Sequence, residues 1–370
     1  MQIELPISKS IANRWLMLQA IHGDELMPVS DSMPDDVQIL HNALTTLRTF
    51  KTSKTLSTPH IDVGNCGTAM RFLTAYCAQL EGQTTILDGI ERMHHRPIGQ
   101  LVDALREIGA DIEYLGEEGF PPLRIKGCIL DKHRIVTINN PQSTQYISAL
   151  LLIGANVITN STSPYINITQ EVIKQYHLSP FSYHLSVEKD WSSAAFWYEY
   201  VALHGGEITL PGLSRDSLQG DKVVADIFTN LGVHTQYTSK GVTIFSTGVA
   251  DLQGIVARST AQRSAEEILH QDFSACPDLY PAVALTCERL GITLDATGTE
   301  SLSIKESDRL RAVREHLTDH DHRMAMALLV AGYPVDDTDC IAKSYPRFLE
   351  QWQAIQTSSP ENLRRFLGYL

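Results

Sequence analysis

Residues 96–126 read RPIGQLVDALREIGADIEYLGEEGFPPLRIK, and this stretch decides the fold class. Leu101, Leu105 and Ile108 lie three and four positions apart, which is the apolar spacing of an amphipathic helix. Gly109 follows, and glycine commonly ends helices because it adopts left-handed backbone angles at little cost. Two expected strands and the turn that joins them complete the unit: 111–115, 116–122 and 123–126. We therefore predict a helix, a glycine and a β-hairpin.

The same order of features recurs along the chain. A second copy begins at Asp221, and helices that open in the same way begin at Asp35 and Asp308. Such units are common in α/β proteins, but their recurrence on both sides of the midpoint favours two similar halves. The apolar positions of the second copy are Val224, Ile227, Phe228 and Leu231, and Gly232 closes its helix. Its expected strands are 233–237 and 242–245.

Two copies of the unit lack their hairpin. Thr318 follows Leu317 directly, where a glycine and two strands are expected, and the helix over 170–176 is also followed by a shortened segment. Either these hairpins are deleted in the protein, or residues near 177 and 317 are missing from the chain as numbered. We favour the second explanation, in which residues are missing from the chain as numbered.

The length and the net charge of the chain exclude several classes of function. A chain of 370 residues is too long for one compact core, so two domains are expected. Its formal net charge of −13 argues against non-specific nucleic-acid binding, which needs a basic surface. The longest apolar candidate, 147–157, is too short to span a membrane. An acidic chain repels anionic metabolites unless its 30 Lys and Arg residues gather in one place.

The cysteines and the first residues indicate the compartment. Six cysteines are scattered without a CxxC pair, which is typical of reduced thiols and argues against a disulfide framework or a zinc site. Residues 1–9 show no basic start followed by an apolar stretch, so we expect no secretory signal. Both observations predict a cytoplasmic protein.

Basic residues stand where loops enter apolar helices. Lys9 and Arg14 flank such a start, with Ser10 between them, and basic residues in a first helical turn oppose the helix dipole. An anion bound at this turn would explain them, and a capped helix with solvated charges is the alternative. Gly67 lies in a glycine-rich turn that is followed by Arg71, which indicates a second anion site.

More junctions have the same character. Ser143, Thr144 and Gln145 open an apolar helix, and they either bind a phosphate or hydroxyl groups or form a plain cap. The run 305–309 contains two acids and two bases, which is usually a solvated face. Here it lies between a strand-like segment at 302–304 and an apolar helix, which favours a site. The remaining basic junctions contain Arg92, Arg96, Arg323 and Lys343.

One acid stands apart from these basic junctions. Asp272 lies beside the apolar Phe273 and before an apolar helix over 279–290, so it is either a desolvated general base or a helix cap. Asp278 is better placed as the cap, which leaves Asp272 for chemistry.

Taken together and in order, these segments resemble the 5-enolpyruvylshikimate-3-phosphate synthases of the enolpyruvyl transferase family. The resemblance implies an α/β fold, a two-domain inside-out α/β barrel in which each domain has three βαβαββ units around a pseudo-three-fold axis. It also implies a continuous domain over 9–189, a discontinuous domain over 1–8 and 190–370, and an active site in the cleft between them. The matching stretches are Ser8–Arg14, Asn65–Arg71, Arg92–Gly109, Ser143–Leu151, Asp190–Ala194, Gln219–Asp221, Asp272–Pro277, Lys305–Leu310, Asp321–Met326 and Lys343–Pro346.

The resemblance implies a transferase of the shikimate pathway, in chorismate and aromatic amino acid biosynthesis. The enolpyruvyl group of phosphoenolpyruvate would move to the 5-hydroxyl of shikimate 3-phosphate, with release of phosphate. Asp272 would be the base towards this hydroxyl, and Glu306 the acid–base group near C3 of phosphoenolpyruvate, with Lys9 and His322 assisting. The residues implied for phosphoenolpyruvate are Lys9, Gly67, Arg96, Gln145, Arg309, Arg323 and Lys343. Those implied for shikimate 3-phosphate are Ser10, Arg14, Ser143, Thr144, Gln145, Tyr165, Asp272 and Lys305.

No metal and no organic cofactor is implied, and we expect a monomer that binds neither nucleic acid nor a membrane. Cys66 stands where alanine is common in the family, and Phe72 where some members have proline. Glyphosate, the family's phosphoenolpyruvate-mimicking inhibitor, is a candidate inhibitor, but these two positions leave its effect open. Ser301 replaces an asparagine that often contacts shikimate 3-phosphate, which puts that contact in doubt. The rival interpretations are a UDP-sugar enolpyruvyl transferase and an inactive anion-binding homologue.

Overall fold

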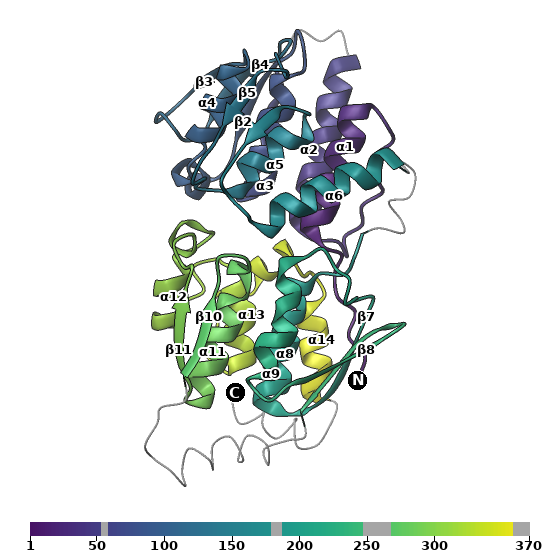
Figure 1. Cartoon of the computed structure of the whole chain (residues 1–370), viewed down its shortest axis with the longest axis vertical. Helices are drawn as coiled ribbons and strands as arrows, with labels where there is room; N and C mark the ends of the chain where they lie inside the picture. Colours follow the sequence, from purple (N-terminus) through teal and green to yellow (C-terminus); the bar gives the residue numbers. More distant parts are fainter. Residues whose placement is uncertain (53–57, 179–186, 247–267, 358–370) are drawn as a thin grey trace. The chain divides into compact units, whose positions relative to one another are not determined.

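The computed structural model describes residues 1–52, 58–178, 187–246 and 268–357. The chain splits into two compact units (Figure 1). The first-half unit comprises 9–31 and 35–187, and the second-half unit comprises 1–8, 32–34 and 188–370. The domain boundaries at 8/9 and 189/190, and the cleft expected between the domains, stay predictions.

The first-half unit contains one complete βαβαββ unit. Its elements are β1 (His60–Asp62), α3 (Gly67–Ala78), β2 (Thr84–Asp88), the 3-10 turn η1 (Glu91–His95), α4 (Gly99–Glu107), β3 (Asp111–Tyr114) and β4 (Leu123–Lys126). The four strands form one sheet in the order β1-β2-β4-β3, with β1 and β2 parallel and β4 antiparallel to both its neighbours. The helix, glycine and hairpin predicted for 96–126 are therefore confirmed.

Helices form the interior of this unit. Its other elements are α1 (Lys9–His22), α2 (Asp35–Thr52), β5 (Ile135–Thr137), α5 (Thr144–Leu152), β6 (Asn156–Ile158) and α6 (Pro164–Leu178). Helices α1, α3 and α5 pack against one another, and nearly every residue of α3 is buried. A helix that is apolar on all sides needs neighbours on all sides, so the strands are displaced to the outside. This arrangement fits the inside-out barrel that was predicted.

The second-half unit repeats the plan. Its main elements are α8 (Trp191–His204), β7 (Gly206–Pro211), α9 (Val224–Thr229), β8 (His234–Thr238), β9 (Gly241–Ser246), β10 (Ile268–Asp272), α11 (Tyr280–Leu290), β11 (Thr293–Thr297), α12 (Arg309–Glu315), α13 (His322–Ala331) and α14 (Phe348–Thr357). Strands β7, β9 and β8 form an antiparallel sheet, and β10 pairs with β11 in parallel. The helix and hairpin predicted after Asp221 are confirmed as α9, β8 and β9.

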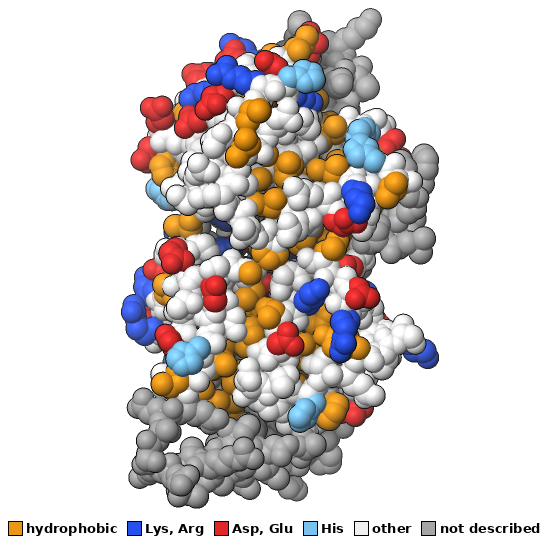
Figure 2. All heavy atoms as spheres, in the orientation of Figure 1, with side chains coloured by type: hydrophobic (Ala, Val, Ile, Leu, Met, Phe, Trp, Pro, Cys, Tyr) orange, Lys and Arg blue, Asp and Glu red, His pale blue; other side chains and the backbone are white. Residues whose placement is uncertain are grey.

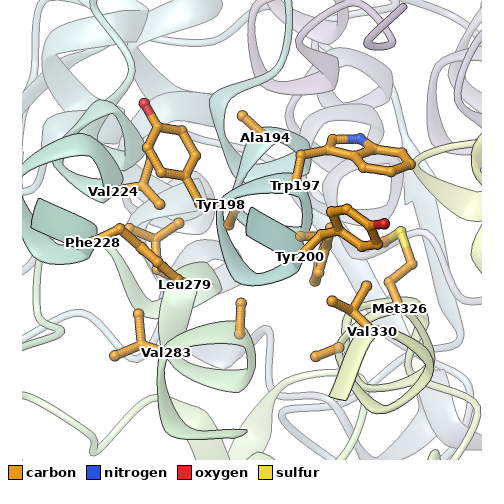
Figure 3. Packing of buried hydrophobic residues seen from close by; sticks show 14 of the residues in the cluster. Ala194, Trp197, Tyr198, Tyr200, Val224, Phe228, Leu279, Val283, Met326 and Val330 are labelled. Carbon is orange, nitrogen blue, oxygen red and sulfur yellow. The ribbon is translucent and has the colours of Figure 1, made fainter. Parts of the chain in front are cut away.

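Helices again lie inside, and Figure 3 shows side chains of α8, α9, α11 and α13 packed together. Side chains from α8, α9, α11 and α13 belong to one buried hydrophobic cluster. Tyr198 of α8 packs on Phe228 of α9 with ring centroids 5.7 Å apart, while Trp197 and Val330 belong to α8 and α13 of the same cluster. Helices α8, α11 and α13 bury one another along their sides. The backbone N–H groups of their first turns have no partner within the helix and can bind polar groups there.

The shortened segment after α12 is closed by a turn. His316 ends the helix with a left-handed φ of 53°, and the backbone N–H of Leu317 donates to the carbonyl of Ala312 at 2.9 Å. The next helix, α13, begins six residues later, with no described strand between them. The second shortened segment, after α6, lies at 179–186 and outside the described residues. Residues 302–304 form a 3-10 turn, so the strand-like interpretation was wrong there.

A buried carboxyl in α8 has no partner among the described residues. Glu199 is fully buried, and neither of its carboxyl oxygens has a hydrogen bond in the described part of the chain. Burial raises the pKa of Glu199 well above its ordinary value, so the folded protein holds it neutral. The unfolded chain releases this proton above about pH 4.3. The buried carboxyl of Glu199 therefore lowers the free energy of unfolding above that pH, and the loss grows as the pH rises. Below that pH this loss is absent.

We expect Glu199→Met to raise the free energy of unfolding by about 1–3 kcal/mol at pH 8, because an apolar side chain removes an unsatisfied buried carboxyl. The gain should be smaller at pH 5. Urea unfolding followed by tryptophan fluorescence measures both values. Glu207→Met, at an exposed position of β7, is the control and should change stability little. A Glu199→Met variant less stable than its parent at pH 8 would contradict the interpretation.

Candidate active site

Acidic and basic side chains are interspersed over the face of the molecule seen in Figure 2. Several arginines near the predicted junctions are instead buried: Arg14, Arg71, Arg309 and Arg323. A buried guanidinium needs acceptors or a counter-ion, since an unpaired buried charge is costly. No described helix is both long enough and apolar enough to cross a membrane.

In the first-half unit two guanidinium groups meet above Gly67. This residue begins α3, and a Cβ placed on it would lie 2.6 Å from Nη1 of Arg71 and 2.6 Å from Nη2 of Arg96. Only a residue without a side chain leaves room for both groups. The N-terminus of α3 adds partial positive charge at the same corner. The glycine-rich turn therefore concentrates positive charge, as an anion site requires.

Arg96 is buried, and its guanidinium has few partners. Its Nη1 lies 3.3 Å from the carbonyl oxygen of Asn65 and 3.5 Å from the side-chain Oδ1 of the same residue. Its Nε has no hydrogen-bond partner, and no carboxylate forms an ion pair with it, within the described ranges. A bound anion would supply the missing counter-charge.

Lys9 joins this corner through Asp36. The Nζ of Lys9 lies 2.9 Å from Oδ2 of Asp36, in the first turn of α2. Cys66 caps α3, because its Sγ accepts from the backbone N–H of Ala69 at 3.4 Å and donates to the carbonyl of Asp36 at 3.8 Å. Lys9 and the turn before Gly67 are thus held by the same residue. Sequence reasoning did not single out Asp36, which looked like an ordinary acid at a helix start.

The start of α5 lies against the same corner. Gln145 donates from Nε2 to Oγ1 of Thr68 at 2.9 Å, which links α5 to α3. Ser143 caps α5, since its Oγ accepts from the backbone N–H of Gln145 at 3.3 Å. Thr144 is the first residue of the helix and, like both its neighbours, is half-buried. The cap interpretation is confirmed for Ser143, and the ligand roles of all three residues stay predictions.

Arg14 is bound within the protein. Its Nε donates to Oγ1 of Thr169 at 2.7 Å and its Nη2 to Oγ of Ser148 at 3.0 Å. It also donates to the carbonyls of Ser10 at 2.6 Å and Tyr165 at 3.1 Å. Burial lowers the pKa of Arg14 to about 10. Arg14 thus holds the backbone of two other predicted ligands, and a direct contact of its own with a ligand stays a prediction.

In the second-half unit, Asp278 binds three cations. Its Oδ1 lies 2.8 Å from Nη1 of Arg309 and 3.7 Å from Nζ of Lys305, and its Oδ2 lies 2.9 Å from Nη2 of Arg323. Burial acts to raise the pKa of Asp278, but the charges of Arg323, Lys305 and Arg309 hold it well below its ordinary value. The prediction that Asp278 caps a helix is wrong, because its side chain is bound to these cations and makes no cap bond.

Glu306 lies between Arg309 and a fourth cation, Lys343. Its Oε2 is 3.2 Å from Nη2 of Arg309, and its Oε1 is 3.4 Å from Nζ of Lys343. Arg309 is 1% exposed and also binds Oδ2 of Asp321 through Nε at 2.7 Å, so the run 305–309 is not a solvated face. His322 is fully buried at the start of α13, with Nδ1 3.7 Å from Oδ1 of Asp321. The structure thus brings together Lys305, Glu306, Arg309, Arg323 and Lys343.

A second buried acid belongs to this cluster. Asp221 lies in the 3-10 turn η2 (Gly220–Val223) and accepts a hydrogen bond from the hydroxyl of Ser192. Burial and the charge of Asp278 raise the pKa of Asp221 to about 7. A carboxyl that titrates near neutral pH can exchange a proton under working conditions. Its sequence signals were its place at the start of a repeat unit and in the matching stretch Gln219–Asp221.

Asp272 differs from expectation. It ends β10 with its carboxylate exposed, and Oδ1 accepts from the N–H and the hydroxyl of Ser274 at 2.8 and 2.6 Å. These bonds lower the pKa of Asp272, so the prediction of a desolvated base is wrong for this unit by itself. Gly298 approaches closely, since a Cβ there would lie 2.2 Å from Oδ1 of Asp272. The role of Asp272 towards the 5-hydroxyl stays a prediction.

The chemistry of both units is that of anion binding. Among the described residues, no three His, Cys, Asp or Glu side chains are grouped so that they could hold a metal ion. In the first-half unit, guanidinium and ammonium groups, hydroxyls and helix N-termini converge, and such groups bind phosphate and carboxylate groups. In the second-half unit the cations are paired with carboxylates: Lys305, Arg309, Arg323 and Lys343 with Asp278, Glu306 and Asp321. The fold and the candidate site are therefore those of an α/β protein that binds multiply charged anions.

Comparison with known proteins names the family. The family model for EPSP synthase (3-phosphoshikimate 1-carboxyvinyltransferase) matches residues 1–179, 179–319 and 315–352. A 3-phosphoshikimate 1-carboxyvinyltransferase from Bacteroides fragilis is 37% identical, over 94% of this chain and 93% of its own. One from Colwellia psychrerythraea is 29% identical, over 95% of each chain. The chain belongs to the EPSP synthase family.

The fold agrees with solved structures. An EPSP synthase from Acinetobacter baumannii aligns with a TM-score of 0.64 at 19% identity over 95% of each chain, which confirms the predicted two-domain α/β fold. The alignment with the Bacteroides fragilis relative runs over 408 positions, so this chain of 370 residues lacks some that the relative has. The three matches to the family model meet at 179 and at 315–319, next to the two segments that the repeat pattern marks as shortened.

Proposed function

We propose that the two clusters of cations perform the reaction of this family. The chain is a transferase of the shikimate pathway: it moves the enolpyruvyl group of phosphoenolpyruvate to the 5-hydroxyl of shikimate 3-phosphate and releases phosphate. The 5-hydroxyl gives up its proton and attacks C2 of phosphoenolpyruvate while C3 gains a proton. The tetrahedral intermediate then loses phosphate from C2 and a proton from C3, which restores the double bond. The predicted cleft between the domains, in which both clusters would act on one pair of substrates, belongs to this proposal.

The observation that carries the proposal is the buried positive charge. The two substrates together bring two phosphates and two carboxylates, and an acidic protein needs concentrated cations to bind them. The corner at Gly67 offers two guanidinium groups, and that of Arg96 has no carboxylate partner among the described residues. Arg323 likewise has one buried guanidinium nitrogen, Nη1, with no hydrogen bond in the described part of the chain.

The proposed ligands follow from these contacts. Phosphoenolpyruvate would be held by Lys9, Gly67, Arg96, Gln145, Arg309, Arg323 and Lys343. Shikimate 3-phosphate would be held by Ser10, Arg14, Ser143, Thr144, Gln145, Tyr165, Asp272 and Lys305. The role of Arg14 is supported chiefly through the carbonyls of Ser10 and Tyr165, which it binds.

The proposed proton transfers use carboxylates with different surroundings. Glu306 lies between Arg309 and Lys343, so it would exchange the proton at C3 with its charge balanced by two cations. Asp272 would accept the proton of the 5-hydroxyl. Its lowered pKa in the exposed state means that a substrate must displace solvent and Ser274 before it becomes a stronger base. Lys9 and His322 would assist.

We expect Arg96→Ala and Lys343→Ala each to reduce turnover at least tenfold, about 1.4 kcal/mol or more of transition-state stabilisation. Each variant removes a cation from a proposed phosphoenolpyruvate contact and leaves the hydrophobic core untouched. Steady-state kinetics measures the effect, and thermal unfolding checks that the protein stays folded. Arg124→Ala is the control, because Arg124 of β4 forms an exposed pair with Glu113 of β3. Wild-type rates in either test variant would exclude that residue from the site.

One assay separates this function from its rivals. Phosphate release from phosphoenolpyruvate should depend on added shikimate 3-phosphate. Release only with a UDP-sugar would favour a UDP-sugar enolpyruvyl transferase, and no release with either acceptor would favour an inactive anion-binding homologue. We further propose a cytoplasmic monomer that binds no membrane or nucleic acid, and glyphosate as a candidate inhibitor at the phosphoenolpyruvate contacts.

A further inference from the structure

A histidine and an aspartate tie the turn before Arg96 to the sheet. Asp88 ends β2, and its Oδ1 accepts from the backbone N–H of Gly89 at 2.7 Å and lies 2.8 Å from Nε2 of His94. His94 belongs to η1, and Arg96 is the residue that follows this turn. The side chain of His94 therefore connects the end of β2 to the segment that delivers the Arg96 guanidinium to Gly67.

The turn η1 is also anchored by Met93, which is fully buried and whose Sδ lies 3.9 Å from Nη1 of Arg71. Its preceding residue, Ile90, makes no side-chain cap, and the backbone N–H of Ile90 donates to the carbonyl of Gly64 at 3.2 Å. Gly89 is packed so closely that a Cβ there would lie 2.5 Å from that carbonyl and 3.0 Å from Cβ of Met93. Because η1 rests directly on the turn that leads to Gly67, a shift of η1 changes the position of Arg96 above that glycine.

The pair lies within a row of charged groups. On the β1 side, Nε2 of His60 lies 3.4 Å from Oδ2 of Asp88. Within η1, Oε2 of Glu91 lies 3.8 Å from Nδ1 of His94, and Oε1 lies 3.3 Å from Nε2 of His95. Partial burial acts to raise the pKa of Asp88, but the bonds from His94, Gly89 and His60 lower it overall. Asp88 is thus an anion at neutral pH.

We propose that His94 and Asp88 are a positioning pair that holds Arg96 over Gly67 for the binding of phosphoenolpyruvate. This inference rests on the proposed function of Arg96. A carboxylate lies at each ring nitrogen of His94, Asp88 at Nε2 and Glu91 at Nδ1. Removing the imidazole removes this hold and lets η1 move.

The test compares three substitutions of the two adjacent histidines. His94→Ala should raise the KM for phosphoenolpyruvate about fivefold at pH 6.5, with kcat and the KM for shikimate 3-phosphate changed less than about twofold. His94→Gln keeps an N–H donor for Asp88 and should restore KM to within about twofold. His95→Gln is the matched control, because His95 contacts only Glu91 among the described side chains and is exposed.

The split between KM and kcat separates positioning from simple structural support. A general structural loss would change kcat and the KM for both substrates, whereas a displaced Arg96 raises the KM for phosphoenolpyruvate alone. An unchanged KM in His94→Ala, or a raised KM that His94→Gln does not restore, would refute the proposal. Should His94→Ala fail to fold, Asp88→Asn gives the same comparison, because it keeps an acceptor and removes the charge.

The outcomes distinguish this inference from the proposed function. If Arg96→Ala leaves the KM for phosphoenolpyruvate unchanged, the role of Arg96 is wrong and the pair has nothing to position. If Arg96→Ala raises that KM while His94→Ala does not, only the positioning pair is overturned. If both raise it and His94→Gln restores it, the positioning pair is supported.

Discussion

Asp278→Ala should lower the free energy of unfolding of the second-half unit by about 3–5 kcal/mol, because it leaves buried cations without their shared carboxylate. The side chains of Arg309 and Arg323 are 1% and 3% exposed and both bind Asp278, so water cannot replace the lost charge. Urea unfolding followed by tryptophan fluorescence measures the change. Of the four tryptophans, Trp191, Trp197 and Trp352 lie in the second-half unit, so the signal reports mainly on that unit.

Asp295→Ala is the control for this prediction. Asp295 pairs with His270 at 2.7 Å, but both side chains are more than half exposed, and such pairs contribute about 0–1 kcal/mol. If Asp278→Ala costs no more than Asp295→Ala, the cations of the cluster do not depend on Asp278.

The effect should also depend on pH with a defined sign. The pKa of Asp278 in the folded protein is below its unfolded value of about 3.9, so its contribution is complete above that pH. The contribution is lost as the pH falls through the lower, folded pKa. The stability difference between the wild type and Asp278→Asn should therefore shrink below about pH 4.

Gly67→Ala should raise the KM for phosphoenolpyruvate at least tenfold while leaving the protein folded, about 1.4 kcal/mol or more. The added methyl group would lie 2.6–2.7 Å from guanidinium nitrogens of Arg71 and Arg96, which is too close for any contact. Arg71 is held by the carbonyl of Pro97 at 2.9 Å, so the Arg96 guanidinium must move. These atoms are the ends of side chains, and alanine favours a helix over glycine, so stability should change little.

Gly99→Ala provides a matched control. Gly99 is also the first residue of its helix, α4, and the nearest atom to a new Cβ is Cα of Gly119 at 3.4 Å. Steady-state kinetics with each substrate varied in turn measures the effect, and the KM for shikimate 3-phosphate should change less than about threefold. A Gly67→Ala enzyme with wild-type KM for phosphoenolpyruvate would show that this substrate does not use the two guanidinium groups.

Local sequence was sufficient for the repeated units. Leu101, Leu105 and Gly109 predicted α4 and the hairpin that follows it, because helix periodicity and glycine at a helix end act over a few residues. The same reasoning failed for 302–304, where an apolar run too short to show a period forms a 3-10 turn. The two missing hairpins were visible in the sequence as gaps in the repeat, and the matches to the family model break at the same places.

The sequence by itself determined which chemical groups stand at the helix starts, because glycines, caps and basic residues there have local causes. Only the tertiary structure decided which charges are paired: Asp278 meets Arg309 and Arg323 from 31 and 45 residues away, and its position beside a helix had suggested a cap. The same holds for Asp272, whose neighbours in sequence suggested burial and whose place at a strand end exposes it. Charge pairing depends on distance through space and on burial, and neither is set by spacing along a chain.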